Sequence, residues 1–420
     1  MRWSRPSTLL ATFLTLLNDR MSESIVFPLL PYLLAGFSND GRVLGLLAGS
    51  YALAQFSFTP LIGALSDRYG RRPVIAVCVA GSLLGLLLFA LTLAMPWQSR
   101  WPGAMAAGWP LALLFAARLI DGMSGGTAAT AAAVLADISA PEERARAFGL
   151  IGVAFGLGFI LGPALGGALA SFGITVPLLL AALIAAVNLA VVVLLLPETH
   201  PPEARSPLPR KRDLQPFAQL ARLLANRPVR RLGAAFFLFF LAFNGFTAVL
   251  VLYLKQAFGW GPSTSALAFL VVGVVATVVQ GGLIGPLVRR FGEWRLTLAG
   301  LGLVIAGFLL ILLATPSTTG AVQVFVALAI LAGGTGLVTP SLRSLVSRRL
   351  DDGSQGAALG SLQGLQSLTG FVGPPLAGLS YETVGRSSPL WFGTLLMAGV
   401  ALLVAGGLPG QAGGTPGSAE

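Results

Sequence analysis

The sequence contains little charge for its length. Only 10% of its 420 residues are Asp, Glu, Lys or Arg, whereas 55% are hydrophobic. A soluble domain carries about 25% charged residues, so this chain has too few to cover a surface that faces water. Most of its side chains must therefore contact something else, which excludes an ordinary soluble globular protein.

Cysteine and histidine are almost absent. Cys78 is the only cysteine, which excludes an intramolecular disulfide. His200 is the only histidine, which excludes a metal site built from several histidines. The sequence also lacks the nucleophile and histidine arrangement of a hydrolytic enzyme. We therefore expect a protein that is not an enzyme and that binds neither a metal nor a cofactor.

Long apolar runs dominate the rest of the sequence. Crossing about 30 Å of hydrocarbon takes about 20 mostly apolar residues, and twelve stretches meet this requirement. The first run follows two arginines, as in a signal peptide, but polar residues interrupt it and no cleavage site follows, so we expect it to be retained. The predicted spans are 9–34, 43–66, 73–95, 109–137, 145–172, 174–196, 232–257, 264–287, 295–315, 320–347, 354–380 and 387–408.

The basic residues predict the orientation of these spans. If the N-terminus is cytoplasmic, 21 of the 27 Lys and Arg residues fall in cytoplasmic segments and four in external segments. Cytoplasmic loops of membrane proteins are enriched in Lys and Arg, so we expect both termini to be cytoplasmic. This distribution accounts for the net charge of +11, and nucleic acid is therefore not an expected partner.

A polar segment rich in Pro and Arg divides the spans six and six. We predict an N-terminal six-helix bundle at 1–196, a cytoplasmic basic linker at 197–231 and a C-terminal six-helix bundle at 232–408. The linker includes an expected surface helix around 214–225, whose basic face would contact anionic membrane lipid. The tail at 409–420 is rich in Gly and Pro, and we expect it to be disordered.

The two predicted bundles share sequence landmarks. Residues 63–72 read GALSDRYGRR after the second span, and residues 285–294 read GPLVRRFGEW after the eighth. The fifth span contains GFILGPALGG at 158–167, and the eleventh contains GFVGPPLAG at 370–378. Matched landmarks in matched spans indicate an all-α membrane protein of twelve transmembrane helices in two six-helix repeats. Transporters built this way bind their substrate near the bilayer midplane, between the halves.

These strings also carry a family resemblance. The run GALSDRYGRRPV at 63–74 resembles the cytoplasmic signature of the major facilitator superfamily, and its surroundings are similar to the tetracycline-exporter group. The resemblance runs from about Asn18 to Tyr381. It implies a monomer of the major facilitator fold in a bacterial inner membrane, which exports small lipophilic or cationic compounds in exchange for protons. The residues of the fifth span that resemble the drug/proton antiporter motif are Gly158, Gly162, Pro163, Gly166 and Gly167.

Ionisable residues inside membrane spans are costly unless they are paired or hydrated, so they are functional candidates. Asp19 and Glu23 are four residues apart on one face of the first span, and Arg20 can pair with Glu23. In the fourth span Arg118 and Asp121 are three apart, and Arg118 matches a proton-coupling arginine of the superfamily. We interpret these five residues as a proton-coupling group; the alternative is a static ion-pair network. We expect spans seven to twelve to hold no deep ionisable residue.

The second half departs from the tetracycline exporters. Ala276 and Val304 stand where those proteins carry a His and an Asp. The resemblance therefore does not extend to that group's proton route, nor to tetracycline itself as the substrate.

Charged residues at the cytoplasmic end of the second span form a further candidate group. Two glycines there suit a close backbone approach and a tight turn. The resemblance implies a gate lock that acts on conformation, with Asp67 at the start of a helix and Arg71 bound to Asp137 at the end of span four. The alternative is a solvated loop. The predicted gate residues are Gly63, Asp67, Arg68, Gly70, Arg71, Arg72 and Asp137.

Uncharged polar side chains within the spans are candidates for lining a substrate cavity, or equally for holding helices together. We expect the N-terminal half to handle protons and the C-terminal half to supply an apolar, hydrogen-bonding wall for the compound. The alternatives to export are uptake of a metabolite or sugar by the same fold, and a receptor that binds without transport. The cavity candidates are Gln55, Asn244, Gln280, Gln363 and Gln366.

Overall fold

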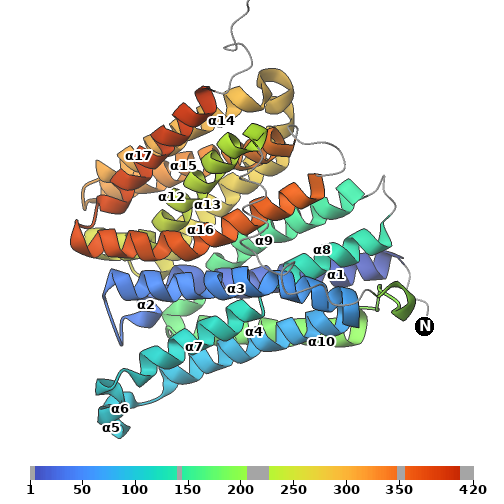
Figure 1. Ribbon diagram of the computed structural model, residues 1–420. Helices are drawn as coiled ribbons and strands as arrows, with labels where there is room; N and C mark the ends of the chain where they lie inside the picture. Colours follow the sequence, from blue (N-terminus) through green and yellow to red (C-terminus); the bar gives the residue numbers. More distant parts are fainter. Residues whose placement is uncertain (1–4, 140–143, 206–226, 348–354, 407–420) are drawn as a thin grey trace, which may run out of the picture.

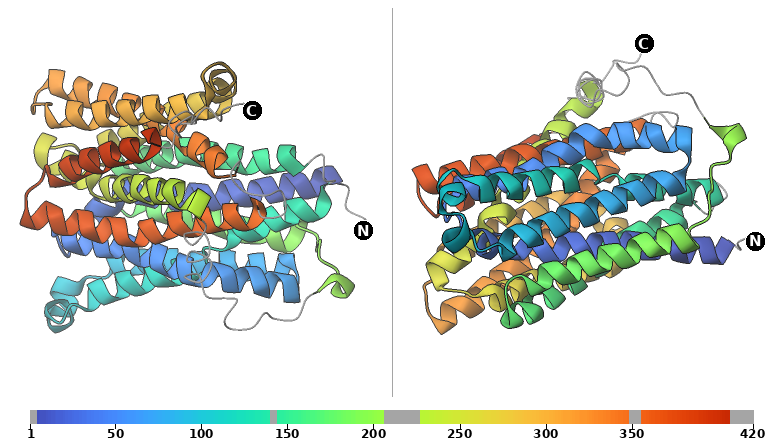
Figure 2. Two further views of the ribbon diagram at one scale, coloured as in Figure 1. Left: turned by 45° about the horizontal axis from the view of Figure 1, so that its top comes forward. Right: turned by 90° about the horizontal axis from the view of Figure 1, so that it is seen from below.

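Within the residues that the structure describes, all regular structure is helical. The helices lie side by side along one long axis and form two groups, one from each half of the chain (Figure 1). Two further views show the same arrangement (Figure 2). The predicted linker helix at 214–225 and the tail at 409–420 lie outside the described residues. The structure, a computed structural model, describes residues 5–139, 144–205, 227–347 and 355–406.

The first half contains the six predicted spans, two of them interrupted. The first span continues from α1 through a 3₁₀ turn into α2, at a point where Pro28 and Pro31 lack the backbone N–H that an α-helix needs. The fourth span is divided between α7 and α8 by Ser124, Gly125 and Gly126. The elements are α1 (Arg5–Val26), η1 (Phe27–Leu29), α2 (Leu30–Leu34), α3 (Gly41–Tyr69), α4 (Arg71–Ala94), α5 (Trp97–Arg100), α6 (Pro102–Ala106), α7 (Trp109–Met123), α8 (Thr127–Ile138), α9 (Arg144–Leu169), η2 (Ala170–Phe172) and α10 (Val176–Leu195).

The second half follows η3 (Pro202–Ala204) and the linker. Its second long helix, α13, passes through a wide π-helical turn, η4, before α14 begins. A Cβ added at Gly281 or Gly282 in this turn would meet no other atom within 4 Å. The elements are α12 (Arg227–Phe258), α13 (Pro262–Val278), η4 (Val279–Leu283), α14 (Ile284–Leu312), α15 (Thr318–Ser347), α16 (Gln355–Thr383) and α17 (Ser388–Ala405).

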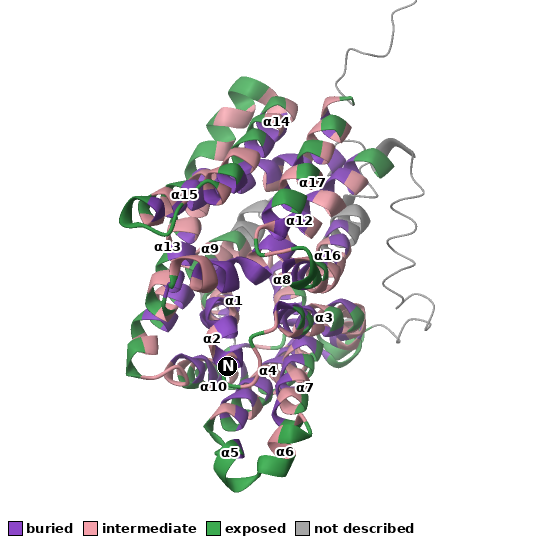
Figure 3. Ribbon diagram, turned by 90° about the vertical axis from the view of Figure 1, so that its left-hand side faces the viewer, coloured by how far each residue is buried: buried purple, intermediate pink, exposed green. Residues whose placement is uncertain are grey.

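Eight helical stretches of the described chain are long and apolar enough to cross a membrane. One of them, Pro262–Leu312, contains both the predicted eighth and ninth spans, which are separated by the non-helical residue Gly292. The first, second and eleventh predicted spans lie in α1, α3 and α16 and are less apolar, since they carry Gly, Ser, Thr and Gln. Figure 3 shows α1 near the centre of the bundle, with many of its residues buried. Polar residues are tolerated there because these helices pack against other helices.

The two halves turn in the same way after their second span. Gly70 ends α3 with φ +103°, and Gly292 occupies the matching place in the second half with φ +77°. Glycine is the residue that adopts positive φ without a steric penalty. The sequence landmark shared by the two halves is therefore also a shared backbone turn.

The halves meet along two seams, α3 against α16 and α9 against α13. In the first seam small residues allow the backbones to approach closely. A Cβ at Gly49 would lie 2.8 Å from the carbonyl oxygen of Phe371, and one at Gly378 would lie 2.8 Å from the carbonyl carbon of Gly41. Figure 1 shows the ribbons of α3 and α16 closest at the left and farther apart toward the end where α1 begins.

Polar contacts between the halves gather at the end of the bundle that is predicted to face outward. The Tyr32 hydroxyl donates to the carbonyl oxygen of Trp260 at 2.5 Å and lies 2.8 Å from the Ser265 hydroxyl. The backbone N–H of Gly41 donates to the Glu382 carboxylate at 2.7 Å. These contacts hold the two halves together at this end.

Candidate functional site

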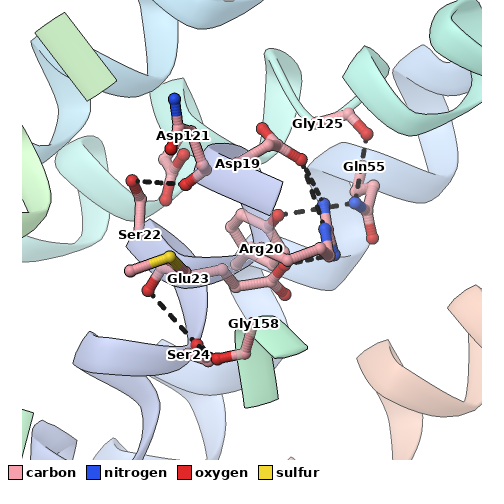
Figure 4. A network of polar contacts seen from close by, with 12 residues as sticks. Asp19, Arg20, Ser22, Glu23, Ser24, Gln55, Asp121, Gly125 and Gly158 are labelled. Carbon is pink, nitrogen blue, oxygen red and sulfur yellow. Dashed lines mark hydrogen bonds and ion pairs between the residues drawn. The ribbon is translucent and has the colours of Figure 1, made fainter. Parts of the chain in front are cut away.

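All five predicted proton-coupling residues line one cavity inside the N-terminal half. The cavity lies between α1, α3, α4, α7 and α10, and the side chains of Tyr51, Ser82 and Asn188 complete its polar wall. The structure thus brings together charged residues from the first and fourth spans, which sequence spacing alone treats as two separate pairs. Figure 4 shows part of this network.

Arg20 lies between two carboxylates of its own helix. Its Nη2 is 2.6 Å from Asp19 Oδ2, and its Nη1 contacts the Glu23 carboxylate (Figure 4). The guanidinium also lies 4.7 Å from the centre of the Phe155 ring. Helix spacing predicts the Glu23 contact but not the Asp19 contact, because adjacent residues do not share a helix face. One positive charge stands against two negative ones, so binding one proton would make this group neutral.

Arg118 is buried and weakly paired. Its Nη1 is 3.5 Å from Asp121 Oδ2, and its guanidinium lies 4.5 Å from the centre of the Tyr51 ring. Its Nε is buried and has no hydrogen-bond partner among the described residues. A buried donor without a partner costs about 1–3 kcal/mol. Arg118 therefore retains capacity to bind a carboxylate, a water molecule or a ligand oxygen.

Gln55 binds the backbone where the fourth predicted span is interrupted. Its Nε2 donates to the carbonyl oxygen of Gly125 at 3.1 Å (Figure 4), a residue in the non-helical segment between α7 and α8. Buried carbonyl groups need a partner when a helix does not supply one. Gln55 thus holds two helices together, which is the second of the two roles predicted for it.

Arg71 is the centre of the predicted gate. Its guanidinium is buried and reaches Asp137 Oδ2 at 3.0 Å, Asp67 Oδ1 at 2.5 Å and the Ser66 hydroxyl at 2.7 Å. The expected position of Asp67 at the start of a helix is wrong. Asp67 lies in the last turn of α3, because that helix continues to Tyr69 before it ends.

The other predicted gate residues differ in their surroundings. Gly70 forms the tight turn between α3 and α4, as its positive φ requires. The close approach expected at Gly63 is wrong, because a Cβ there would meet no atom within 4 Å. Arg68 is exposed and lies over the Tyr69 ring at 5.4 Å, outside the ion-pair network. The Arg72 guanidinium contacts the carbonyl oxygen of Val193.

Glu198 belongs to this gate although the sequence did not assign it there. Its carboxylate accepts hydrogen bonds from the backbone N–H groups of Arg71 at 2.9 Å and Arg72 at 3.2 Å, at the start of α4. A carboxylate at a helix N-terminus satisfies free N–H groups and interacts favourably with the helix dipole. Nearby, Thr199 donates to Asp137 at 3.2 Å. The only sequence signal is an acidic residue directly after Pro197, and its partners are too distant in the chain to be predicted.

The glycines of the fifth span face the charged helix α1. A Cβ at Gly158 would lie 2.7 Å from Arg20 Cβ, and one at Gly162 would lie 2.9 Å from Ser24 Cβ. A Cβ at Gly166 would lie 3.1 Å from a carbonyl oxygen of α1. Ser24 also donates to the carbonyl oxygen of Gly158 at 2.8 Å (Figure 4). These glycines therefore allow α9 to pack directly against the helix that carries Asp19.

The last glycine of that span faces the other half. The Ser263 hydroxyl of α13 donates to the carbonyl oxygen of Gly167 at 2.8 Å. A Cβ at this glycine would also crowd Ala266 of the same helix. Together with Pro163, which lies inside α9, the antiporter-like segment joins α1 on one side to α13 on the other.

The polar residues of the second half lie on several helices. Asn244 donates to the Thr369 hydroxyl at 2.9 Å, and Gln366 accepts from Arg343 at 2.7 Å. Gln280 is exposed in the π-helical turn η4. The side chain of Gln363 lies outside the described residues.

The expectation that the second half holds no deep ionisable residue stays a prediction, and two charged residues lie near the ends of its helices. Arg343 lies near the C-terminal end of α15, which continues through Pro340 to Ser347. Glu293 is buried after Gly292, with Ser344 donating to its carboxylate at 3.1 Å. Neither residue lies deep in a predicted span.

Comparison with known families agrees with this architecture. The family model described as "Major Facilitator Superfamily" matches residues 9–374. The chain belongs to the major facilitator superfamily. It is therefore a multi-pass membrane transporter and not an enzyme.

Individual relatives place the chain within the superfamily. The tetracycline resistance protein, class C, of Escherichia coli is 32% identical over 391 residues, which cover 92% of each chain. The crystal structure of the human organic anion transporter MFSD10 is 27% identical with a TM-score of 0.70, and covers 96% of this chain and 100% of the other. A D-xylose–proton symporter structure has a TM-score of 0.74 over 94% of this chain and 96% of its own, but at 18% identity it shows the fold alone.

Proposed function

We propose that this transporter exports small lipophilic compounds in exchange for protons, by alternating access of a central site to the two sides of the membrane. The observation that carries the proposal is Arg20, which is buried between Asp19 and Glu23 in an enclosed cavity. The group is one proton short of neutrality, and binding a proton would change the charge around a buried guanidinium. Such a change biases the conformation in which the proton is held.

The antiporter-like segment supports exchange over simple uptake. α9 packs through its glycines on the proton helix α1 and contacts α13 of the other half. A change in charge around Arg20 would therefore act directly on a helix at the boundary between the halves. The similarity to tetracycline resistance proteins supports the same direction of transport. Proton-coupled uptake of a sugar or metabolite has no comparable support in the site.

The membrane arrangement is part of the proposal. We infer a bacterial inner-membrane protein with both termini in the cytoplasm, since relatives are bacterial resistance proteins and basic residues are concentrated in the segments on that side. The bundles at 1–196 and 232–408 would then move as a monomer around the central site. The linker at 197–231 would contact anionic lipid at the cytoplasmic surface.

Reconstitution tests this function. Purified protein in proteoliposomes is given an imposed pH gradient, and accumulation of a panel of lipophilic compounds is followed together with proton movement. Accumulation that depends on the gradient and is matched by proton flux in the opposite direction is the expected result. Accumulation with proton flux in the same direction would assign the chain to symport, and binding without accumulation would assign it to a receptor.

A further inference from the structure

Arg343 is an arginine near the C-terminal end of a helix of the C-terminal bundle. It lies within α15 and is partly buried, and its Nη2 donates to Gln366 Oε1 of α16 at 2.7 Å. Within the described ranges no carboxylate forms an ion pair with it. A guanidinium has five N–H donors, so this amide occupies only part of its hydrogen-bonding capacity.

The buried arginines of the N-terminal half differ in this respect. Arg20, Arg71 and Arg118 each form an ion pair with at least one carboxylate. Removing a charge from water is expensive unless an opposite charge or full hydrogen bonding offsets the cost. Arg343 therefore lies where a negatively charged group from outside the chain would be favourable.

Gln366 places this group beside the seam between the halves. It lies one turn along α16 from Gly370, so the two share a helix face. A Cβ at Gly370 would lie 3.1 Å from Ala52 Cβ of α3, in the other half. Gln55 follows Ala52 by three residues on α3. Polar side chains from both halves therefore flank the seam, next to the contact between Gly370 and Ala52.

We propose that Arg343 and Gln366 form a subsite that binds an anionic group, a carboxylate or sulfonate, on the exported compound. The planar guanidinium fork matches the two oxygens of such a group, and the Gln366 amide fixes its orientation. The substrate class is a small lipophilic organic anion. This assignment rests on the proposed export function and adds to it the chemistry of the compound.

A purely structural role for Arg343 makes a different prediction. An arginine near the end of a membrane helix also extends its charge toward the interface while its stem packs on apolar surface. In that case removing the charge would affect anionic and cationic compounds equally. The subsite requires an effect that depends on the sign of the ligand charge.

The probes are naphthalene-1-sulfonate and a naphthyl trimethylammonium ion. Both charges are fixed at all working pH values, so a pH gradient cannot accumulate either probe by passive trapping. Binding is followed by quenching of tryptophan fluorescence, since the chain has seven Trp residues, and transport by accumulation in proteoliposomes. The variants are Arg343→Gln and Arg343→Lys, with Arg100→Gln as the control because Arg100 is exposed in α5.

The expected result is at least tenfold weaker binding of the sulfonate to Arg343→Gln, a smaller loss for Arg343→Lys, and no change for Arg100→Gln. The thermal midpoint of Arg343→Gln should stay close to that of the wild type, which separates ligand binding from misfolding. Unchanged sulfonate binding by Arg343→Gln would overturn the subsite, as would wild-type protein that binds only the cation or neither probe. Sulfonate binding that depends on Arg343 without gradient-driven accumulation would keep the subsite and refute the export function.

Discussion

Glu382 and Gly41 join the two halves of the transporter at one end. The carboxylate of Glu382, near the end of α16, accepts the backbone N–H of Gly41 at the first residue of α3, over 2.7 Å. The first N–H groups of a helix have no partner within the helix. The second half therefore supplies a partner to the first half, in the conformation in which this end is closed.

Removing this carboxylate should open that end more often. A hydrogen bond to a charged group contributes about 1.5–3 kcal/mol, and solvent exposure reduces this to about 1 kcal/mol. Glu382→Ala should thus shift the equilibrium between the closed and open states about fivefold toward the open state. Labelling of a cysteine introduced near Tyr32, in a Cys78→Ser background, measures the change. Glu382→Gln keeps an acceptor oxygen, so its extent of labelling should lie between those of the wild type and Glu382→Ala. Equal labelling of all three proteins would contradict a role for Glu382 in closing this end.

The acidic partners of Arg20 should carry the coupled proton. Asp19→Asn and Glu23→Gln each remove one negative charge, so the group is already neutral and a further proton would leave the Arg20 charge unbalanced. Accumulation driven by a pH gradient should fall at least tenfold in one or both variants. Exchange of labelled for unlabelled compound, which needs no net proton movement, should continue. Full gradient-driven accumulation in both variants would refute the assignment.

The gate at Arg71 should affect turnover more than binding. Arg71→Gln leaves Asp67 and Asp137 without their shared cation, and Asp67→Asn weakens the same network. We expect transport rates to fall at least tenfold while the dissociation constant of the compound changes less than about twofold, because the network acts on the conformational equilibrium. Glu198→Gln should produce a smaller loss in the same direction. A large loss of affinity at unchanged rate would place Arg71 in the binding site.

Asn244 should influence which compounds are carried, without changing proton coupling. It donates to Thr369 between α12 and α16 and lies outside the charged cavity of the first half. Asn244→Ala should change the relative transport rates of several compounds by severalfold and leave the pH dependence of transport in place. Transport is measured against pH for each compound. A shifted pH profile with the original order of preference would show that the halves are not specialised in this way.

Asp40 offers a test of local stability that is independent of transport. It caps α3 by accepting the backbone N–H of Arg42 at 2.7 Å, and hydrogen bonds from the Arg42 side chain lower the pKa of its carboxyl. A lowered pKa means that the carboxylate stabilises the fold above its unfolded pKa of about 4 and loses this effect as the pH falls through the folded value.

Asp40→Ala should therefore cost about 1 kcal/mol at neutral pH. Asp40→Asn keeps a side-chain cap but loses the ion pair, so its stability should differ less from that of the wild type than the stability of Asp40→Ala does. Thermal unfolding in detergent between pH 7 and pH 3 measures both variants. The gap between the wild type and Asp40→Asn should narrow as the pH falls, and a gap that widens would contradict the assignment.

Sequence patterns predicted those parts of the molecule that depend on local spacing. The spans, the repeat at Gly70 and Gly292, and the pairing of Arg20 with Glu23 follow from hydrophobic length, glycine chemistry and helix periodicity. The contact between Arg71 and Asp137 came from a family motif rather than from spacing. Contacts of this kind join residues far apart in the sequence, and only a resemblance or a structure reveals them.

The errors have physical causes of the same kind. Glu198 was not assigned a role because its partners are backbone N–H groups, which leave no trace in the sequence. Gly63 shows the reverse: a glycine inside a matching motif suggested close packing, and its surroundings are open.

The wide turn η4 has a consequence for the second half of the eighth span. A π turn holds one residue more than an α turn, and each residue of an α-helix rotates the chain by about 100°. Side chains after Leu283 therefore point about 100° away from where an unbroken helix would direct them. Deleting Gly281 or Gly282 would let an ordinary α-helical turn replace η4 and would leave Arg289 and Arg290 pointing in their present direction, because the lost residue removes the rotation of about 100° that the π turn absorbs. The wide turn thus accommodates one additional residue without changing the direction in which the following charges point.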